Sequence, residues 1–467
     1  MNTNKSKGEE LKEKLFSNRK NLGTLMDDNE IILADNFCEE YKNFLNKGKT
    51  EREAAEYIIK KAQAKGFKPF NREHSFVPGD KVYYVNREKA VILAVIGKKP
   101  LDSGVKIIAA HIDSPRLDLK VSPLYEDKEL AFFKTHYYGG IKKYQWTALP
   151  LSLHGVIIKK DGTKIKINIG EDEKDPVFCI TDLLPHLASE QMKKTLADGI
   201  KGEDLNILIG SKPFKDDKAS ELVKLNIANI LYEKYGIIED DFLSAELECV
   251  PQIKAADVGF DRSMIGGYGQ DDRVCAYAAL TSIFDCNIPE HTAVTVLTDK
   301  EEVGSDGNTG LNSAYLKNFI SDLAFTQKLR TSVVLRNSKC LSADVNAAFD
   351  PNFPDVLEAK NSAYINYGIV VTKYTGSRGK AGTSDASAEF MGEVRHLFDE
   401  KNIKWQIGEL GKVDAGGGGT VAMYIANMDI DVVDVGVPVL SMHSPFEITS
   451  KLDIFTAYKA FLEFFKI

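Results

Sequence analysis

The sequence predicts an α/β fold in which a mainly parallel sheet is covered by helices and a β-rich second domain is inserted. Short apolar runs are separated by helical segments, which is typical of parallel strands that are buried on both faces. Residues 117–253 instead alternate apolar and polar positions between turn signals, as antiparallel hairpins do. We therefore assign residues 1–116 and 254–467 to the main domain and residues 117–253 to the inserted domain.

The elements of the main domain are predicted from their periodicity. A helix over residues 50–64 opens with Thr50 and Glu53, the spacing of a capping box, and continues with apolar residues at helical intervals. Apolar runs predict buried strands at residues 91–96, 105–110, 292–298, 332–335 and 432–439. Further helices are expected over residues 272–284, 309–316, 384–399 and 451–465.

The inserted domain has the sequence pattern of antiparallel hairpins. A turn at residues 137–140, alternating apolar positions over 151–157 and the Asp161-Gly162 turn signal predict these hairpins. The later stretch, residues 171–220, is charged and is expected to be largely loop.

Composition excludes several classes of function. The 467 residues include 60 Lys and Arg against 68 Asp and Glu, a formal charge of -8, which does not suggest a nucleic-acid partner. No run approaches the ~18 apolar residues of a membrane span, and the first residues lack the apolar core of a signal peptide. We expect a cytoplasmic protein with no membrane partner, whose six scattered cysteines are buried free thiols.

Histidine and acidic side chains follow the predicted strands at the points where the strands end. In open α/β sheets ligands bind beyond the carboxyl ends of the strands, so such side chains converge in space. Another carboxylate stands where the helix over residues 272–284 begins. The side chains concerned are His111, Asp113, Asp271, Glu301, Glu302, Asp344 and His443.

This set of residues is typical of a two-metal hydrolase. Imidazole and carboxylate suit Zn²⁺, Mn²⁺ or Co²⁺, and one Asp can bridge two ions. Adjacent residues of an extended segment point in opposite directions, so one Glu can bind metal while Glu301 serves as the base. Asp113 lies two residues after His111 and can orient its imidazole.

Each residue also has an ordinary structural interpretation. Asp271 or Asp272 could cap the following helix, either histidine could be structural, and the other acidic residues could lie in solvated loops or turns. The metal interpretation is favoured because all of them fall at strand exits. The glycine run at residues 416–419 lacks the Gly-Lys-Ser/Thr ending of a phosphate loop, so we expect a flexible turn beside substrate.

These motifs resemble those of the M18 metallo-aminopeptidases, the family of aspartyl aminopeptidase and vacuolar aminopeptidase I. The resemblance covers nearly the whole chain. It is carried by Ala-His-Ile-Asp-Ser-Pro at 110–115, Asp-Asp-Arg at 271–273, Asp-Lys-Glu-Glu-Val-Gly-Ser at 299–305, Ser-Ala-Asp-Val-Asn at 342–346 and Met-His-Ser at 442–444.

The resemblance implies a metallo-exopeptidase fold with two divalent ions in each subunit, zinc first and manganese or cobalt as alternatives. His111, Asp271 and Asp344 would hold one ion, and Asp271, Glu302 and His443 the other. Glu301 would be the general base. The family places a dimerisation or regulatory domain at the insertion and assembles tetrahedral dodecamers from dimers.

One further residue is singled out by the resemblance. The segment Leu-Leu-Pro-His-Leu at residues 183–187 is similar to the family position where a histidine enters the partner subunit's site, so His186 is a catalytic candidate. A structural histidine in a hydrophobic turn is the alternative.

The function expected is removal of the N-terminal residue from short peptides with a free N-terminus. A two-metal deacylase or amidase uses the same site chemistry and is the first alternative. A catalytically idle oligomeric scaffold is the second, although such a protein would not need to keep Glu301 beside five ligand-type residues.

Overall fold

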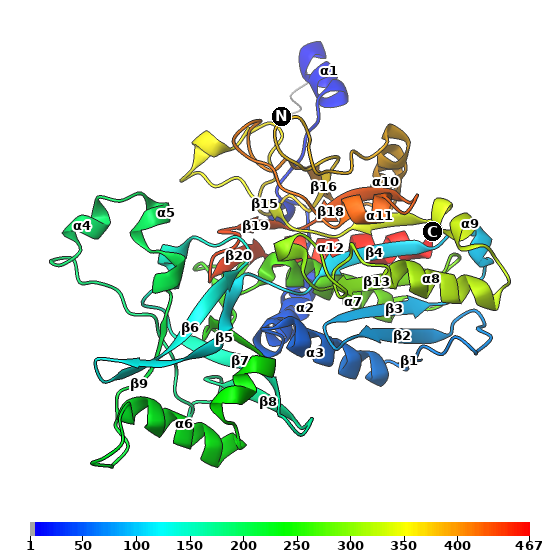
Figure 1. Ribbon diagram of the computed structural model, residues 1–467. Coiled ribbons are helices and arrows are strands. Elements are labelled where there is room, and N and C mark those ends of the chain that lie inside the picture. Colours follow the sequence, from blue (N-terminus) through cyan, green and yellow to red (C-terminus); the bar gives the residue numbers. More distant parts are fainter. Residues whose placement is uncertain (1–4) are drawn as a thin grey trace.

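The largest sheet has nine strands, in the order β1-β2-β3-β13-β4-β14-β18-β16-β17 (Figure 1). The computed structural model describes residues 5–467. The four central strands, β13, β4, β14 and β18, run parallel, whereas β3 and β16 pair with them antiparallel. In chain order the strands are β1 (Lys68–Pro69), β2 (Lys81–Asn86), β3 (Ala90–Val95), β4 (Lys106–His111), β13 (Ala293–Thr298), β14 (Lys339–Ser342), β16 (Ile369–Thr372), β17 (Trp405–Ile407) and β18 (Asp431–Gly436).

Helices cover both faces of this sheet because its strands are apolar on both sides. In β4, Ile108 and Ala110 face one hydrophobic cluster, and Ile107 and Ala109 face the other. The first face is covered by α2 (Asp28–Lys47), α3 (Glu51–Ala64), α7 (Gln270–Asp285), α10 (Ala388–Glu400) and α12 (Lys451–Lys466). The second is covered by α8 (Tyr315–Thr326), α9 (Thr331–Arg336) and α11 (Ala422–Ala426).

A second sheet of six strands is built wholly from residues 116–251 and is antiparallel throughout. Figure 1 shows it to one side of the main sheet, with α6 (Leu222–Tyr235) packed on it. The second sheet has a separate hydrophobic cluster, in which Trp146 is fully buried. Its strands are β5 (Arg116–Asp127), β6 (Leu130–Tyr138), β7 (Leu151–Ile158), β8 (Lys164–Ile169), β9 (Ile207–Gly210) and β10 (Ala245–Pro251).

A third sheet, which the sequence did not predict, has five short strands. They are β11 (Ala256–Val258), β12 (Met264–Gly267), β15 (Asn346–Ala347), β19 (Pro438–Leu440) and β20 (Glu447–Ser450). The remaining three helices are short, namely α1 (Lys7–Leu15), α4 (Ser189–Met192) and α5 (Leu196–Gly199). None of the helices between residues 5 and 467 combines the length and the apolar content that a membrane span requires.

Most predicted elements are confirmed, including the Thr50 cap of α3, whose hydroxyl accepts the N–H of Glu53. The predicted strand at residues 332–335 is wrong, because these residues form α9 and the strand is β14, a few residues later. A four-residue apolar run fits a helix turn as well as a strand, so the pattern could not decide. All six cysteines are free thiols, as predicted, and five of them are buried, whereas Cys179 is partly exposed.

Two other expectations need correction. The helix predicted over residues 309–316 begins only at Tyr315. Residues before it fold back on Ser305, where a side chain at Gly310 would meet the Ser305 carbonyl oxygen at 2.1 Å. The apolar run 432–439 divides into β18 and β19, which belong to different sheets.

Buried charges join the start of α3 to the second sheet. The Lys49 ammonium lies 2.7 Å from Glu171, and His154 lies between Glu53 at 2.9 Å and Glu171 at 3.3 Å. Burial alone would raise the pKa of Glu171, but His154, Lys49 and Ser152 outweigh it and lower that pKa to about 2. The ionised carboxylate is therefore favoured in the folded chain.

We expect Glu171→Gln to lower the thermal unfolding midpoint at pH 7 by several degrees. The pKa of Glu171 falls from an ordinary 4.5 to about 2 on folding. Its stabilisation, on the order of 3 kcal/mol, is thus complete above pH 4.5 and is lost as the pH falls toward 2. The midpoint difference between the variant and the unmodified protein, both treated with chelator, should shrink by more than half at pH 3.

The matched control is Glu173→Gln, because Glu173 is exposed in the same loop. It should leave the midpoint unchanged at both pH values. A Glu171→Gln difference of equal size at pH 7 and pH 3 would contradict the electrostatic explanation.

Candidate metal centre

The carboxyl ends of the central strands deliver the predicted ligands to one place. His111 ends β4, and Glu301 and Glu302 form a 3-10 turn directly after β13. Asp344 follows β14, and His443 lies between β19 and β20. Asp271 stands in the first turn of α7, immediately after β12.

Asp271 lies between the two histidines. Its Oδ1 is 3.1 Å from His111 Nε2, and its Oδ2 is 3.2 Å from His443 Nε2. His443 Nε2 is in turn 3.6 Å from Glu302 Oε2. Each imidazole therefore contacts a different oxygen of the same carboxylate, which is the arrangement that a bridging ligand needs.

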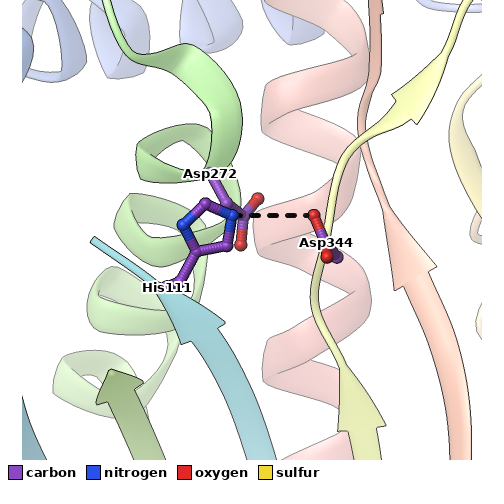
Figure 2. Close-up of side chains that lie close together, drawn as sticks. All are labelled: His111, Asp272 and Asp344. Atoms are coloured by element: carbon purple, nitrogen blue, oxygen red, sulfur yellow. Dashed lines mark ion pairs between the residues drawn. The ribbon is translucent and has the colours of Figure 1, made fainter. Parts of the chain in front are cut away.

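On the His111 side, two more carboxylates converge. His111 Nε2 lies 3.9 Å from Asp344 Oδ1 and 3.8 Å from Glu301 Oε2. Figure 2 shows His111, Asp344 and a residue not predicted as a ligand, Asp272, with their polar atoms directed toward one another. Ligand atoms of these three lie within 4.8 Å of one another, as do those of His111, Asp271 and Glu302.

Asp272 is fully buried, and neither of its carboxylate oxygens has a hydrogen-bond partner. The sequence offered it only as a helix cap. One sequence signal could have identified Asp272. It is the second of two adjacent acidic residues at the start of a helix, α7, that is buried in the structure.

Asp113 lies on the His111 side of the centre. Its Oδ1 is 3.3 Å from His111 Nδ1 and accepts the backbone N–H of Glu301 at 3.2 Å. Its Oδ2 accepts the N–H of Glu302 at 3.3 Å and the hydroxyl of Tyr138 at 2.8 Å. The Asp113 backbone oxygen lies 3.1 Å from the same His111 Nδ1, so Asp113 contacts the histidine through backbone and side chain, and its carboxylate fixes the turn that carries the two glutamates.

Glu447 supports the opposite side and was missed by sequence reasoning. This buried residue accepts the N–H of His443 at 2.7 Å and the N–H of Asp271 at 3.0 Å. Burial, reinforced by Asp271, raises the pKa of Glu447 to about 8. No local pattern marks it, because its role depends on the unpredicted third sheet.

The electrostatics of the cluster are those of a cation site. Burial raises the pKa of Glu301 to about 7, with Asp271 and Asp113 adding to the rise. Burial also holds the pKa values of Glu302 and Asp344 well above their usual range. Glu302 Oε1 and both oxygens of Asp272 lack hydrogen-bond partners. Buried carboxylates without partners are costly unless a cation neutralises them, so this donor set fits divalent metal ions.

The histidines show the complementary effect. Burial lowers the pKa of His443, but Asp271 and Glu302 outweigh it and raise that pKa to about 10. Burial raises the pKa of Asp271, yet its bonds to His111 and His443 hold it below its ordinary value. Asp271 is therefore favoured in its ionised form.

A cavity of about 1210 Å³ opens onto the cluster. Asp271, Glu301, Glu302, Asp344 and His443 form its acidic wall, and Lys142 also lines it. The glycine run lines it at residues 417–419. Much of the remaining wall is apolar, formed by Phe353, Val356, Leu357, Leu410, Met423 and Met442.

His186 does not join this cluster within one chain. It lies in an exposed turn just before α4. Figure 1 shows α4 at the outer edge of the molecule, on the side of the second sheet.

A β-sheet whose strand ends carry a histidine–carboxylate cluster of this kind is typical of metal-dependent hydrolases. The chain belongs to the M18 aminopeptidases, because the family model of aminopeptidase I zinc metalloprotease (M18) matches residues 44–465. A probable M18 family aminopeptidase 1 of Clostridium acetobutylicum is 50% identical over 459 residues, covering 96% of this chain and 99% of the relative.

Solved structures agree with this assignment. The crystal structure of the M18 aminopeptidase from Thermotoga maritima superposes with a TM-score of 0.93 at 44% identity, covering 97% of this chain and all of that one. The Saccharomyces cerevisiae mApe1 dodecamer shares the fold at 22% identity, with a TM-score of 0.75 and 94% and 97% coverage.

Proposed function

We propose that this M18 aminopeptidase cleaves the N-terminal residue from short peptides with a two-metal centre. The contact of Asp271 with both histidines is the observation that carries the proposal. His111, Asp271 and Asp344 would hold one ion, and Asp271, Glu302 and His443 the other. Zinc is the first candidate, since the family is one of zinc metalloproteases, and manganese or cobalt suit the same donors. The buried Asp272 is a further candidate ligand on the His111 side.

Glu301 is the proposed general base. When bound, a pair of divalent ions lowers the pKa of a shared water and polarises the scissile carbonyl. Glu301 lines the cavity beside the ligands and accepts the water's proton, then returns it to the departing amine. Asp113 holds the backbone of this turn in place.

We expect Glu301→Gln to lower kcat by roughly 10² to 10⁴, because the amide keeps the shape of the side chain but cannot accept a proton. Zinc content, measured by elemental analysis, should stay near that of the unmodified protein. Turnover within about tenfold of the original would reassign the base.

Asp271→Ala provides the contrast. It removes the one carboxylate shared by both ligand sets, so the variant should lose both ions as well as activity. Two tightly bound ions in this variant would contradict the bridging role.

The shape and lining of the cavity bear on the substrate. The acidic wall can receive the free α-amino group of a peptide, and the apolar wall beyond it suits an uncharged side chain. We therefore propose that neutral, apolar N-terminal residues are preferred to acidic ones.

The zinc-loaded protein should hydrolyse leucyl and methionyl p-nitroanilides with higher kcat/KM than the aspartyl compound. It should leave N-acetyl-leucyl p-nitroanilide intact, because the acetyl group removes the charge that the acidic wall receives. Hydrolysis of the acetylated compound at a similar rate would favour the deacylase or amidase alternative. Preference for the aspartyl compound would overturn the assignment of the apolar wall.

We also propose that residues 117–253 form a dimerisation domain inserted into the catalytic domain of residues 1–116 and 254–467, with dimers assembling into a tetrahedral dodecamer. Exposed leucines surround His186, with Leu183, Leu184 and Leu187 at 52%, 50% and 69% exposure. Apolar groups gathered on a surface mark an interaction site. The dodecameric S. cerevisiae mApe1, which shares the fold, is consistent with such an assembly.

His186 would then enter the partner subunit's site and donate a hydrogen bond to the developing oxyanion. Loss of such a donor typically costs roughly 10² to 10³ in rate, so His186→Ala should be nearly inactive. A mixed oligomer of Glu301→Ala and His186→Ala subunits should recover activity. In it, one subunit donates His186 to a neighbour that keeps Glu301.

The mixture is prepared by co-expression with two affinity tags, and tandem purification isolates the hybrids. His136→Ala is the matched control, because His136 is an exposed histidine of the same region. Hybrids without activity, or normal turnover by His186→Ala alone, would contradict the shared site.

A further inference from the structure

The end of β6 reaches from the second sheet into the metal centre. The Tyr138 hydroxyl donates to Asp113 Oδ2 at 2.8 Å, and the Gly140 carbonyl oxygen lies 2.8 Å from His443 Nδ1. Between them, a side chain at Gly139 would lie 3.1 Å from Glu302 Oε2. Tyr138 at the end of β6 and the two residues after it therefore contact both halves of the cluster.

The Tyr138 hydroxyl completes the hydrogen bonding of the Asp113 carboxylate, which also contacts several other groups. Asp113 is fully buried and holds His111 and the backbone N–H groups of Glu301 and Glu302. A carboxylate with donors fixed on both oxygens has one orientation. Without the tyrosine hydroxyl, Oδ2 keeps only the 3.3 Å bond from the Glu302 N–H, so the Asp113 carboxylate is held less tightly.

Tyr138 is itself held in position by residues that lie outside the metal centre. The Arg116 guanidinium lies 3.9 Å from the centroid of its ring, in cation–π contact. Arg116 is fixed by ion pairs to Glu51 at 3.1 Å and Asp118 at 2.8 Å. The position of the hydroxyl thus depends on the second sheet and the start of α3, and Tyr138 does not line the substrate cavity.

We propose that Tyr138 is a positioning residue for the metal centre and acts through Asp113 on His111 and on the turn carrying the two glutamates. The inference rests on the proposed function, since it assumes that these residues bind metal. It assigns to the second sheet a part in metal affinity and turnover, in addition to any part in assembly. Hydrogen-bond partners of metal ligands typically contribute 10- to 100-fold to affinity or activity.

Tyr138→Phe tests the proposal, because it removes the hydroxyl and keeps the ring over Arg116. The zinc dissociation constant, measured by competition with a chromophoric chelator, should rise about tenfold. At saturating zinc, kcat for leucyl p-nitroanilide should fall by a similar factor, while KM stays within about twofold, since Tyr138 does not contact substrate. The unfolding midpoint of the metal-free variant should match that of the unmodified protein.

Tyr137→Phe is the matched control. It lies one residue earlier on β6, points to the opposite face and is 41% exposed. This variant should keep the zinc affinity, kcat and KM of the unmodified protein.

A double variant separates positioning from a general structural effect. Tyr138→Phe should add little to the loss caused by Asp113→Asn, because the hydroxyl acts through that carboxylate. Additive losses would overturn the proposal. So would zinc affinity and kcat unchanged in Tyr138→Phe, or a lower midpoint as its only effect. An unmodified protein that binds no zinc would instead refute the proposed function.

Discussion

The structure depends on one electrostatic constraint, the confinement of several carboxylates at the ends of the central strands. Asp271 and Asp272 are buried, and the side chains of Glu302 and Asp344 are only 2% and 11% exposed. Two imidazoles cannot neutralise so many acidic groups, so the folded chain either protonates some of them or binds cations. Metal binding and folding free energy are therefore linked, with protons released as metal enters.

Two further buried carboxylates hold the segments that carry the proposed ligands. Asp113 and Glu447 each accept two backbone N–H groups from the segments that carry the ligands. The parallel strands bring the ligands to one edge of the sheet, and these two residues set their orientation. Rigid backbone around a charged centre reduces the reorganisation needed during reaction.

The structural features that could be predicted from the sequence were those marked by a pattern in neighbouring residues. Continuous apolar runs marked the buried strands, and polar residues at their ends marked the cluster around His111 and His443. Residues 332–335 were misassigned because a four-residue apolar run fits two kinds of element. Asp272 resembled a helix cap, and Glu447 and Tyr138 act through contacts with residues distant in the sequence. His186 stays a prediction, since a single chain does not bring it to the ligands.

The pairing of His443 with Gly140 joins residues separated by most of the chain. During synthesis the second sheet and His111 emerge early, whereas His443 follows 332 residues after His111. The proposed ligand set can therefore be completed only after the whole second sheet has been made.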